Sequence, residues 1–131
     1  MNINNDSSMQ FIKLGLDASA LREKVIANNM ANINTKDFKK SYVSFEENLT
    51  KATQDFSLKK TKKEHLNGEL NDSLISVKQD KSTSMRTDGN NVDMDLEKVN
   101  QAANTLMYNA LITQANSKLN MTKSVISGGS R

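Results

Sequence analysis

Side chains that could carry out acid–base or metal chemistry are few and scattered in this chain of 131 residues. His65 is the single histidine, and the absence of cysteine excludes disulfides, thiol catalysis and cysteine-based zinc sites. The carboxylate pairs Glu46–Glu47 and Asp93–Asp95 fall on segments with helical patterning, where charge pairing and capping explain them better than general acid–base catalysis. The sequence also has no glycine-rich phosphate-binding loop. It therefore predicts no enzyme, no metal, no cofactor and no small-molecule substrate, and a surface or interface role for His65.

The positive charge is modest and local. The chain has a net charge of +3, and its densest cationic cluster consists of Lys59, Lys60, Lys62 and Lys63. Nucleic-acid-binding domains usually combine such a patch with interleaved aromatics or a recognisable motif, whereas charge runs usually stay hydrated. We expect no nucleic-acid partner. A helical adaptor or weak nucleic-acid-binding module is the alternative function, and salt-dependent binding to a duplex would support it.

The N-terminus lacks the features of a cleaved secretory signal. Residues 1–8 are polar, with no basic segment followed by an apolar one. No run of about 20 apolar residues occurs, as a transmembrane helix would need. We expect a protein that stays in the cytosol or leaves it without a cleaved signal peptide.

Two stretches at opposite ends of the chain have apolar residues at alternating steps of three and four, which predicts long amphipathic helices. The first runs from about residue 7 to 32 and has the stripe Phe11, Leu14, Ala18, Leu21, Val25, Asn28 and Asn32. The second runs from about residue 92 to 126 and has the stripe Val92, Leu96, Val99, Ala103, Leu106 and Ala110, continued with a rotational drift by Leu111, Ala115, Leu119 and Ile126.

Turn and capping residues mark the limits of these helices. Asp6, Ser7 or Ser8 can cap the first helix, and Asn91 or Asp93 the second. Asp88-Gly89-Asn90 is a turn signal before the second helix, and Gly128-Gly129 ends it. Between them, a short helix is expected from Phe45 to Ala52 and a short strand at Leu74–Val77.

These elements predict a helix-dominated fold in which the long terminal helices pack as a coiled-coil-like pair. The segments are an N-terminal helix (1–36), an irregular middle that is partly β or disordered (37–91), and a C-terminal helix (92–131) in one domain with the first. Hydrophobic residues make up 36%, so we expect either a thin core or a core that other subunits complete. The side chains predicted to pack between subunits are Leu14, Leu21, Val25, Asn28, Asn32, Leu96, Val99, Leu106, Leu111 and Leu119.

Two segments resemble a known family. Residues 27–39 (ANNMANINTKDFK) resemble the N-terminal signature of flagellar rod, hook and hook-associated proteins, although Lys36 and Asp37 replace its usual Pro and Gly. Residues 88–97 (DGNNVDMDLE) resemble the segment that opens the C-terminal helix of a proximal-rod subunit. Residues 37–49, 61–66 and 104–111 match the same family in order. The signature residues are Ala31, Asn32, Thr35, Phe38, Lys39, Gly89, Asn90, Val92 and Asp93.

The resemblance implies a structural subunit of the proximal rod, which polymerises through its terminal helices and links the membrane ring to the rest of the rod. The implied partners are further copies, other rod subunits, the protein at the ring–rod junction and the flagellar type III export apparatus. The implied location is the periplasmic rod, reached without a cleaved signal. Phe45 and Leu49 have the spacing that is associated with docking at the export gate, and core packing is the equal alternative.

The Asn-rich end of the first helix generates a prediction. A buried Asn in a helical seam tends to fix register at a cost in stability. Replacing Asn28 and Asn32 with Ala is therefore expected to impair assembly more than helicity, as measured by rod formation in cells and circular dichroism of the purified chain. Normal rods in the double variant would contradict this interpretation.

Overall fold

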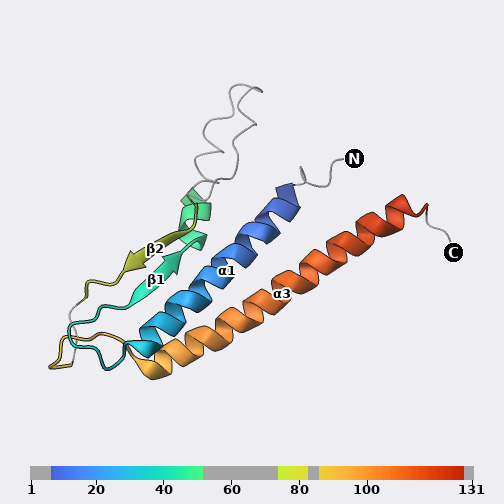
Figure 1. The fold of residues 1–131 in the computed structure, drawn as a ribbon. Coiled ribbons are helices and arrows are strands. Elements are labelled where there is room, and N and C mark those ends of the chain that lie inside the picture. The colour runs from blue at the N-terminus through green and yellow to red at the C-terminus, as the bar shows by residue number, and fades with distance from the viewer. Residues whose placement is uncertain (1–6, 52–73, 83–85, 129–131) are drawn as a thin grey trace, which may run out of the picture.

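The computed structural model describes residues 7–51, 74–82 and 86–128, and two long antiparallel helices dominate it. The elements are α1 (Ser7–Ala31), β1 (Ser41–Ser44), β2 (Ser76–Gln79) and α3 (Met94–Ile126), with a short helical segment at residues 46–51. The helices α1 and α3 lie side by side, and β1 lies against α1 and pairs with β2 (Figure 1). The predicted helix-dominated fold with paired terminal helices is confirmed.

The ends of α3 follow from its local sequence. The Asp93 carboxylate accepts hydrogen bonds from the backbone N–H groups of Asp95 and Leu96, at 2.9 and 3.3 Å. Acidic side chains in the first turn and Lys123 in the last turn complement the helix dipole. The chain leaves the helix through Ser127 and Gly128, whose φ of 70° is left-handed. Capping by Asp93 is confirmed.

The apolar core lies between α1 and the middle segment. Leu14 and Ala18 of α1 are buried against Phe45, and Leu49, Leu74 and Ile75 pack around this cluster. The apolar cluster on α1 is thus covered by Phe45, Leu49, Leu74 and Ile75 of the middle segment. The middle segment contributes to the fold although its composition is polar.

The two strands form a small antiparallel sheet, in which Ser41 pairs with Gln79 and Ser44 with Ser76. The strand predicted at Leu74–Val77 is wrong by two residues, because Leu74 and Ile75 are drawn into the core and the ladder begins at Ser76. The first strand was not predicted, since its sequence, SYVS, is short and mostly polar.

The loop around Gly89 requires left-handed backbone. Gly89 has a φ of 77°, and an added Cβ would meet the Asp37 carboxylate. Asp37 itself has a φ of 57°. It occupies the position where the family signature has Gly, and Asp is among the few residues that tolerate this conformation.

A matched pair of glycine variants tests this loop. Gly89→Ala and Gly128→Ala both introduce left-handed strain, which costs about 1–2 kcal/mol. Only Gly89→Ala also crowds Asp37, since nothing lies near Gly128. We expect Gly89→Ala to lower the free energy of unfolding in urea by clearly more than Gly128→Ala. Equal losses would show that the approach to Asp37 is unimportant.

Candidate assembly surface

The seam between α1 and α3 is polar. At its centre, Asn104 Nδ2 donates to the Ser19 carbonyl oxygen (3.1 Å) and to Glu23 Oε2 (3.2 Å), and Ser19 Oγ donates to Asn104 Oδ1 (3.1 Å). Gln101 Nε2 donates to Glu23 Oε1 at 2.7 Å. Ser19 and Asn104 are buried. Such bonds give little net stability, but they are costly to break once buried, so they fix the register of the two helices.

The Asn29 amide joins α1, β1 and α3 at the end of the seam where α1 ends and α3 begins. Asn29 of α1 is only 1% exposed. Its Nδ2 donates to the Ser41 carbonyl oxygen (2.8 Å) and to Glu97 Oε2 (3.1 Å), and its Oδ1 accepts from the Ser41 N–H (3.0 Å). The side chain pairs with the backbone of β1 as a neighbouring strand would, while Glu97 holds it to α3.

An apolar contact crosses the seam between Gly15 of α1 and Leu111 of α3. Gly15 is buried, and a Cβ at Gly15 would lie only 3.1 Å from Leu111 Cδ1. The absence of a side chain at Gly15 lets Leu111 approach the α1 backbone.

The two signature segments form one corner. Asn90 is fully buried, and its Nδ2 donates to the carbonyl oxygens of Asn32, Ile33 and Thr35 at 2.9–3.0 Å. Its Oδ1 accepts from the Val92 N–H at 2.8 Å. The end of α1 is thereby tied to the start of α3, although the two segments are 58 residues apart.

Other signature residues complete this corner. Lys39 Nζ donates to the Gly89 carbonyl oxygen (2.9 Å), and the Asn91 N–H donates to the Phe38 carbonyl oxygen (3.4 Å). Val92 is buried, whereas Ala31 and Thr35 are exposed. The signature thus builds an intramolecular corner, at the end of the molecule remote from both termini (Figure 1).

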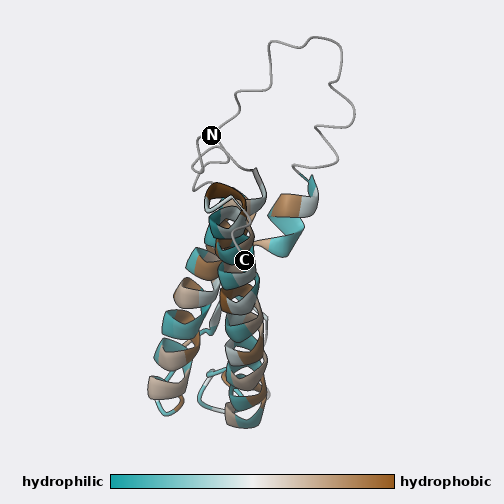
Figure 2. Ribbon diagram, turned by 90° about the vertical axis from the view of Figure 1, so that its right-hand side faces the viewer, coloured by the Kyte–Doolittle hydropathy of each residue, from teal (hydrophilic) through white to brown (hydrophobic). Residues whose placement is uncertain are grey.

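The most regular apolar pattern of α3 faces outward. We call Leu96, Val99, Ala103, Leu106 and Ala110 the outward stripe. Leu96, Val99 and Leu106 are 45%, 64% and 71% exposed. The seam residues Glu97, Gln101 and Asn104 have the same three-and-four spacing on another face of the helix. Figure 2 shows hydrophobic and hydrophilic residues alternating along both long helices.

The other predicted packing residues lie in different environments. Leu14 lies in the core, and Leu111 lies against Gly15. Leu119 is exposed near the end of α3. The half-buried members are Leu21, Val25 and Asn32, and Asn28 is exposed. The structure therefore does not bring all ten together, and their role between subunits stays a prediction.

A groove lies where α1, β1 and α3 meet. Its volume is about 300 Å³, and its walls include Val25, Ile26, Tyr42, Ala103 and Met107.

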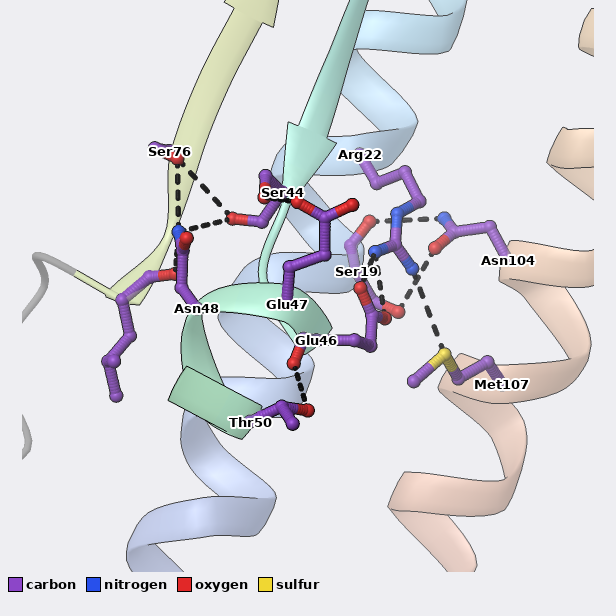
Figure 3. A network of polar contacts seen from close by, with 11 residues as sticks. Ser19, Arg22, Ser44, Glu46, Glu47, Asn48, Thr50, Ser76, Asn104 and Met107 are labelled. Carbon is purple, nitrogen blue, oxygen red and sulfur yellow. Dashed lines mark hydrogen bonds and ion pairs between the residues drawn. The ribbon is translucent and has the colours of Figure 1, made fainter. Parts of the chain in front are cut away.

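Arg22 lines this groove and forms an ion pair with Glu46. Both Glu46 carboxylate oxygens accept from Arg22 Nη2 at 2.9 Å, and Met107 Sδ accepts from Nη1 at 3.8 Å (Figure 3). Partial burial raises the pKa of Glu46, but the hydrogen bond and charge of Arg22, with backbone N–H groups, outweigh it and hold that pKa below 4.5.

The carboxylates considered in the sequence have structural roles here. Glu47 lies 3.6 Å from Lys78 Nζ, Glu46 pairs with Arg22, and Asp93 caps α3. Within residues 7–51, 74–82 and 86–128, no group of three metal-ligating side chains occurs. Over the same residues, no helix has the length and apolarity needed to cross a membrane.

Two further predictions have separate outcomes. Phe45 is buried in the core and Leu49 packs against it, so this pair is covered in the folded chain, and docking at an export gate stays a prediction about the unfolded one. His65 and the lysine cluster at 59–63 lie outside the described residues.

The Asn90 amide generates a test of the corner. Asn90→Asp keeps the shape and the acceptor for Val92 but removes the donor to three carbonyl oxygens. We expect a loss of about 1–3 kcal/mol in the free energy of unfolding, because three part-buried hydrogen bonds of a fully buried side chain are lost. The exposed Asn109→Asp is the control, and urea unfolding followed by circular dichroism is the measurement. Similar stability for both variants would contradict the assigned role.

Sequence comparisons identify relatives over nearly the whole chain, although no family model matches it. The flagellar basal body rod protein FlgB of Bacillus subtilis is 35% identical over 93% of this chain and 95% of its own length. FlgB of Borreliella burgdorferi is 37% identical over 81% and 85%, and FlgB of Salmonella typhimurium is 26% identical over 95% and 96%. Because the first of these relatives is covered almost completely at this identity, the chain belongs to the FlgB family of flagellar basal body rod proteins, which are structural proteins and not enzymes.

Proposed function

We propose that this chain is a subunit of the proximal rod that polymerises through its terminal helices and links the membrane ring to the rest of the rod. The observation that supports this most is the direction of the outward stripe. Leu96, Val99 and Leu106 are exposed on α3, while the seam behind them is closed by hydrogen bonds. The stripe is therefore free to pack against helices of neighbouring subunits.

The energetics favour association through this surface. Burying a large aliphatic side chain contributes about 1.5–3 kcal/mol. Folding of a single chain gains little of this at Val99 and Leu106, which remain 64% and 71% exposed. The gain becomes available when a neighbour covers the stripe, so assembly adds apolar burial that the chain lacks alone.

The partners follow from the same surface and from the route to the rod. Further copies of this chain and other rod subunits would cover the stripe, and the ring–rod junction protein would meet the end of the assembly. The type III export apparatus would pass the chain to the periplasm without a cleaved signal. The lack of cysteine suits passage as an unfolded chain, because no disulfide can form.

Export and folding would use Phe45 and Leu49 in turn. Both side chains belong to or pack on the apolar core, so the export gate would meet them only before the chain folds. Their burial after export would then contribute to the folded subunit.

Electron cryotomography of motors tests the proposed role. A strain lacking the gene is complemented with the natural chain, with Leu106→Glu or with Asn109→Glu. Both positions are exposed, so each substitution should change the stability of the free chain by less than about 0.5 kcal/mol. We expect rings without rods for Leu106→Glu and complete motors for Asn109→Glu.

Two results would contradict the proposal. Complete motors in the strain lacking the gene would remove the rod role altogether. Complete motors with Leu106→Glu would instead leave the rod role in place and show that the outward stripe is not an assembly surface.

A further inference from the structure

The C-terminal end of α3 projects beyond α1. The two helices have 33 and 25 residues, and Gly15 lies opposite Leu111. Because the helices are antiparallel, moving eight residues back along α1 from Gly15 to Ser7 corresponds to moving eight residues forward along α3 from Leu111 to Leu119. Ser7 therefore lies at about the level of Leu119. Residues 120–126 then extend roughly 10 Å past Ser7, the first residue described. We call residues 119–126 the overhang.

The overhang is apolar and exposed. Leu119, Met121, Val125 and Ile126 are 45%, 58%, 72% and 71% exposed. Four large apolar side chains within eight residues of one helix form a surface that the described part of this chain leaves open to solvent.

The groove between α1, β1 and α3 is a surface complementary to the overhang. Its apolar walls include Val25, Ala103 and Met107, and Tyr42, 47% exposed, stands at its edge. It is concave and adjoins the outward stripe through Ala103, which belongs to both. A helix end placed there would gain apolar contact with α1, β1 and α3 together.

The charges of the two surfaces are opposite. From residue 98 to the end of the chain no acidic residue occurs, and Lys118 and Lys123 flank or lie in the overhang. Among the described residues that line the groove, Arg22 and Glu97 are charged, and Glu97 is only 3% exposed. Arg22 is paired with Glu46, whose side chain is 54% exposed, so these three groups together leave one net negative charge. Such complementarity favours and orients the encounter of the two surfaces.

We propose that the overhang of one copy docks in the groove of a second copy. The inference rests on the proposed rod function and names the surfaces through which copies meet. Groove and overhang are different surfaces of the same chain, about 27 Å apart along α3 between Ala103 and Met121. A contact between them is heterologous, so it continues from copy to copy, as a ring or as an open helical series, and cannot form a symmetric pair.

The lack of cysteine makes this contact directly testable in the full chain. Two single-cysteine variants, Ala103→Cys in the groove and Val125→Cys in the overhang, are purified, mixed and oxidised mildly, with one of them carrying a size tag. A disulfide needs the two Cβ atoms within about 3.5–4.5 Å, so a mixed product reports close approach. Asn109→Cys, exposed on another face of α3, replaces Ala103→Cys in the control mixture.

The proposal predicts that the mixed Ala103→Cys and Val125→Cys disulfide is the dominant product and exceeds that of the control mixture. The double variant Ala103→Cys/Val125→Cys should form a ladder of multimers. Products that join only two copies of Ala103→Cys would overturn it in favour of symmetric stripe-to-stripe pairing. A mixed product no more abundant than the control would overturn it as well.

These outcomes are separable from failure of the rod role. Absence of the mixed disulfide, together with loss of rods in Leu106→Glu cells, would remove this contact and leave the rod function standing. Complete motors without the gene would remove the rod function whatever the disulfides show.

Discussion

Buried amides that must be fully hydrogen-bonded determine how the rest of this chain is arranged. Asn29, Asn90 and Asn104 are almost inaccessible to water, and each binds groups from other segments of the chain. Within residues 7–51, 74–82 and 86–128, no buried side-chain nitrogen or oxygen lacks a partner. Since an unpaired buried polar group costs about 1–3 kcal/mol, a shift of α3 along α1 would break several of these bonds at once. The register of the pair and the shape of its corner are therefore specified by polar contacts.

This specification has a consequence for assembly. A seam built from Ser19, Asn104 and Glu97 contributes less than an apolar seam of the same area would. The apolar side chains of α3 are turned outward instead, at Leu96, Val99 and Leu106. The two faces of α3 therefore have different roles. Its polar face fixes the fold of the subunit, and its apolar face remains available to neighbouring subunits. This division also gives a physical reason for a rod protein to have so thin a core.

Periodicity and local chemistry predicted much of this fold, but not which face of α3 packs against α1. The spacing of three and four residues predicted both long helices, Asp93 predicted the cap, and the two signature segments predicted the family. The spacing of the outward stripe was also visible in the sequence. The seam residues repeat with the same spacing, shifted by one position along the chain. The spacing alone therefore does not show which face of α3 packs against α1. The partners of Asn29 and Asn90 lie up to 68 residues away, and no local rule finds such pairs. The strand β2 begins two residues later than predicted because Leu74 and Ile75 pack against the core.

If the outward stripe is the assembly surface, it is exposed in the free chain and covered in the rod. Maleimide labelling of single-cysteine variants measures this directly, with Leu106→Cys on the stripe and Asn109→Cys as the reference, in the purified chain and in isolated basal bodies. An assembly surface at the stripe predicts similar labelling of both thiols in the free chain and strong protection of Leu106→Cys alone in basal bodies. Equal labelling of the two thiols in basal bodies would contradict it.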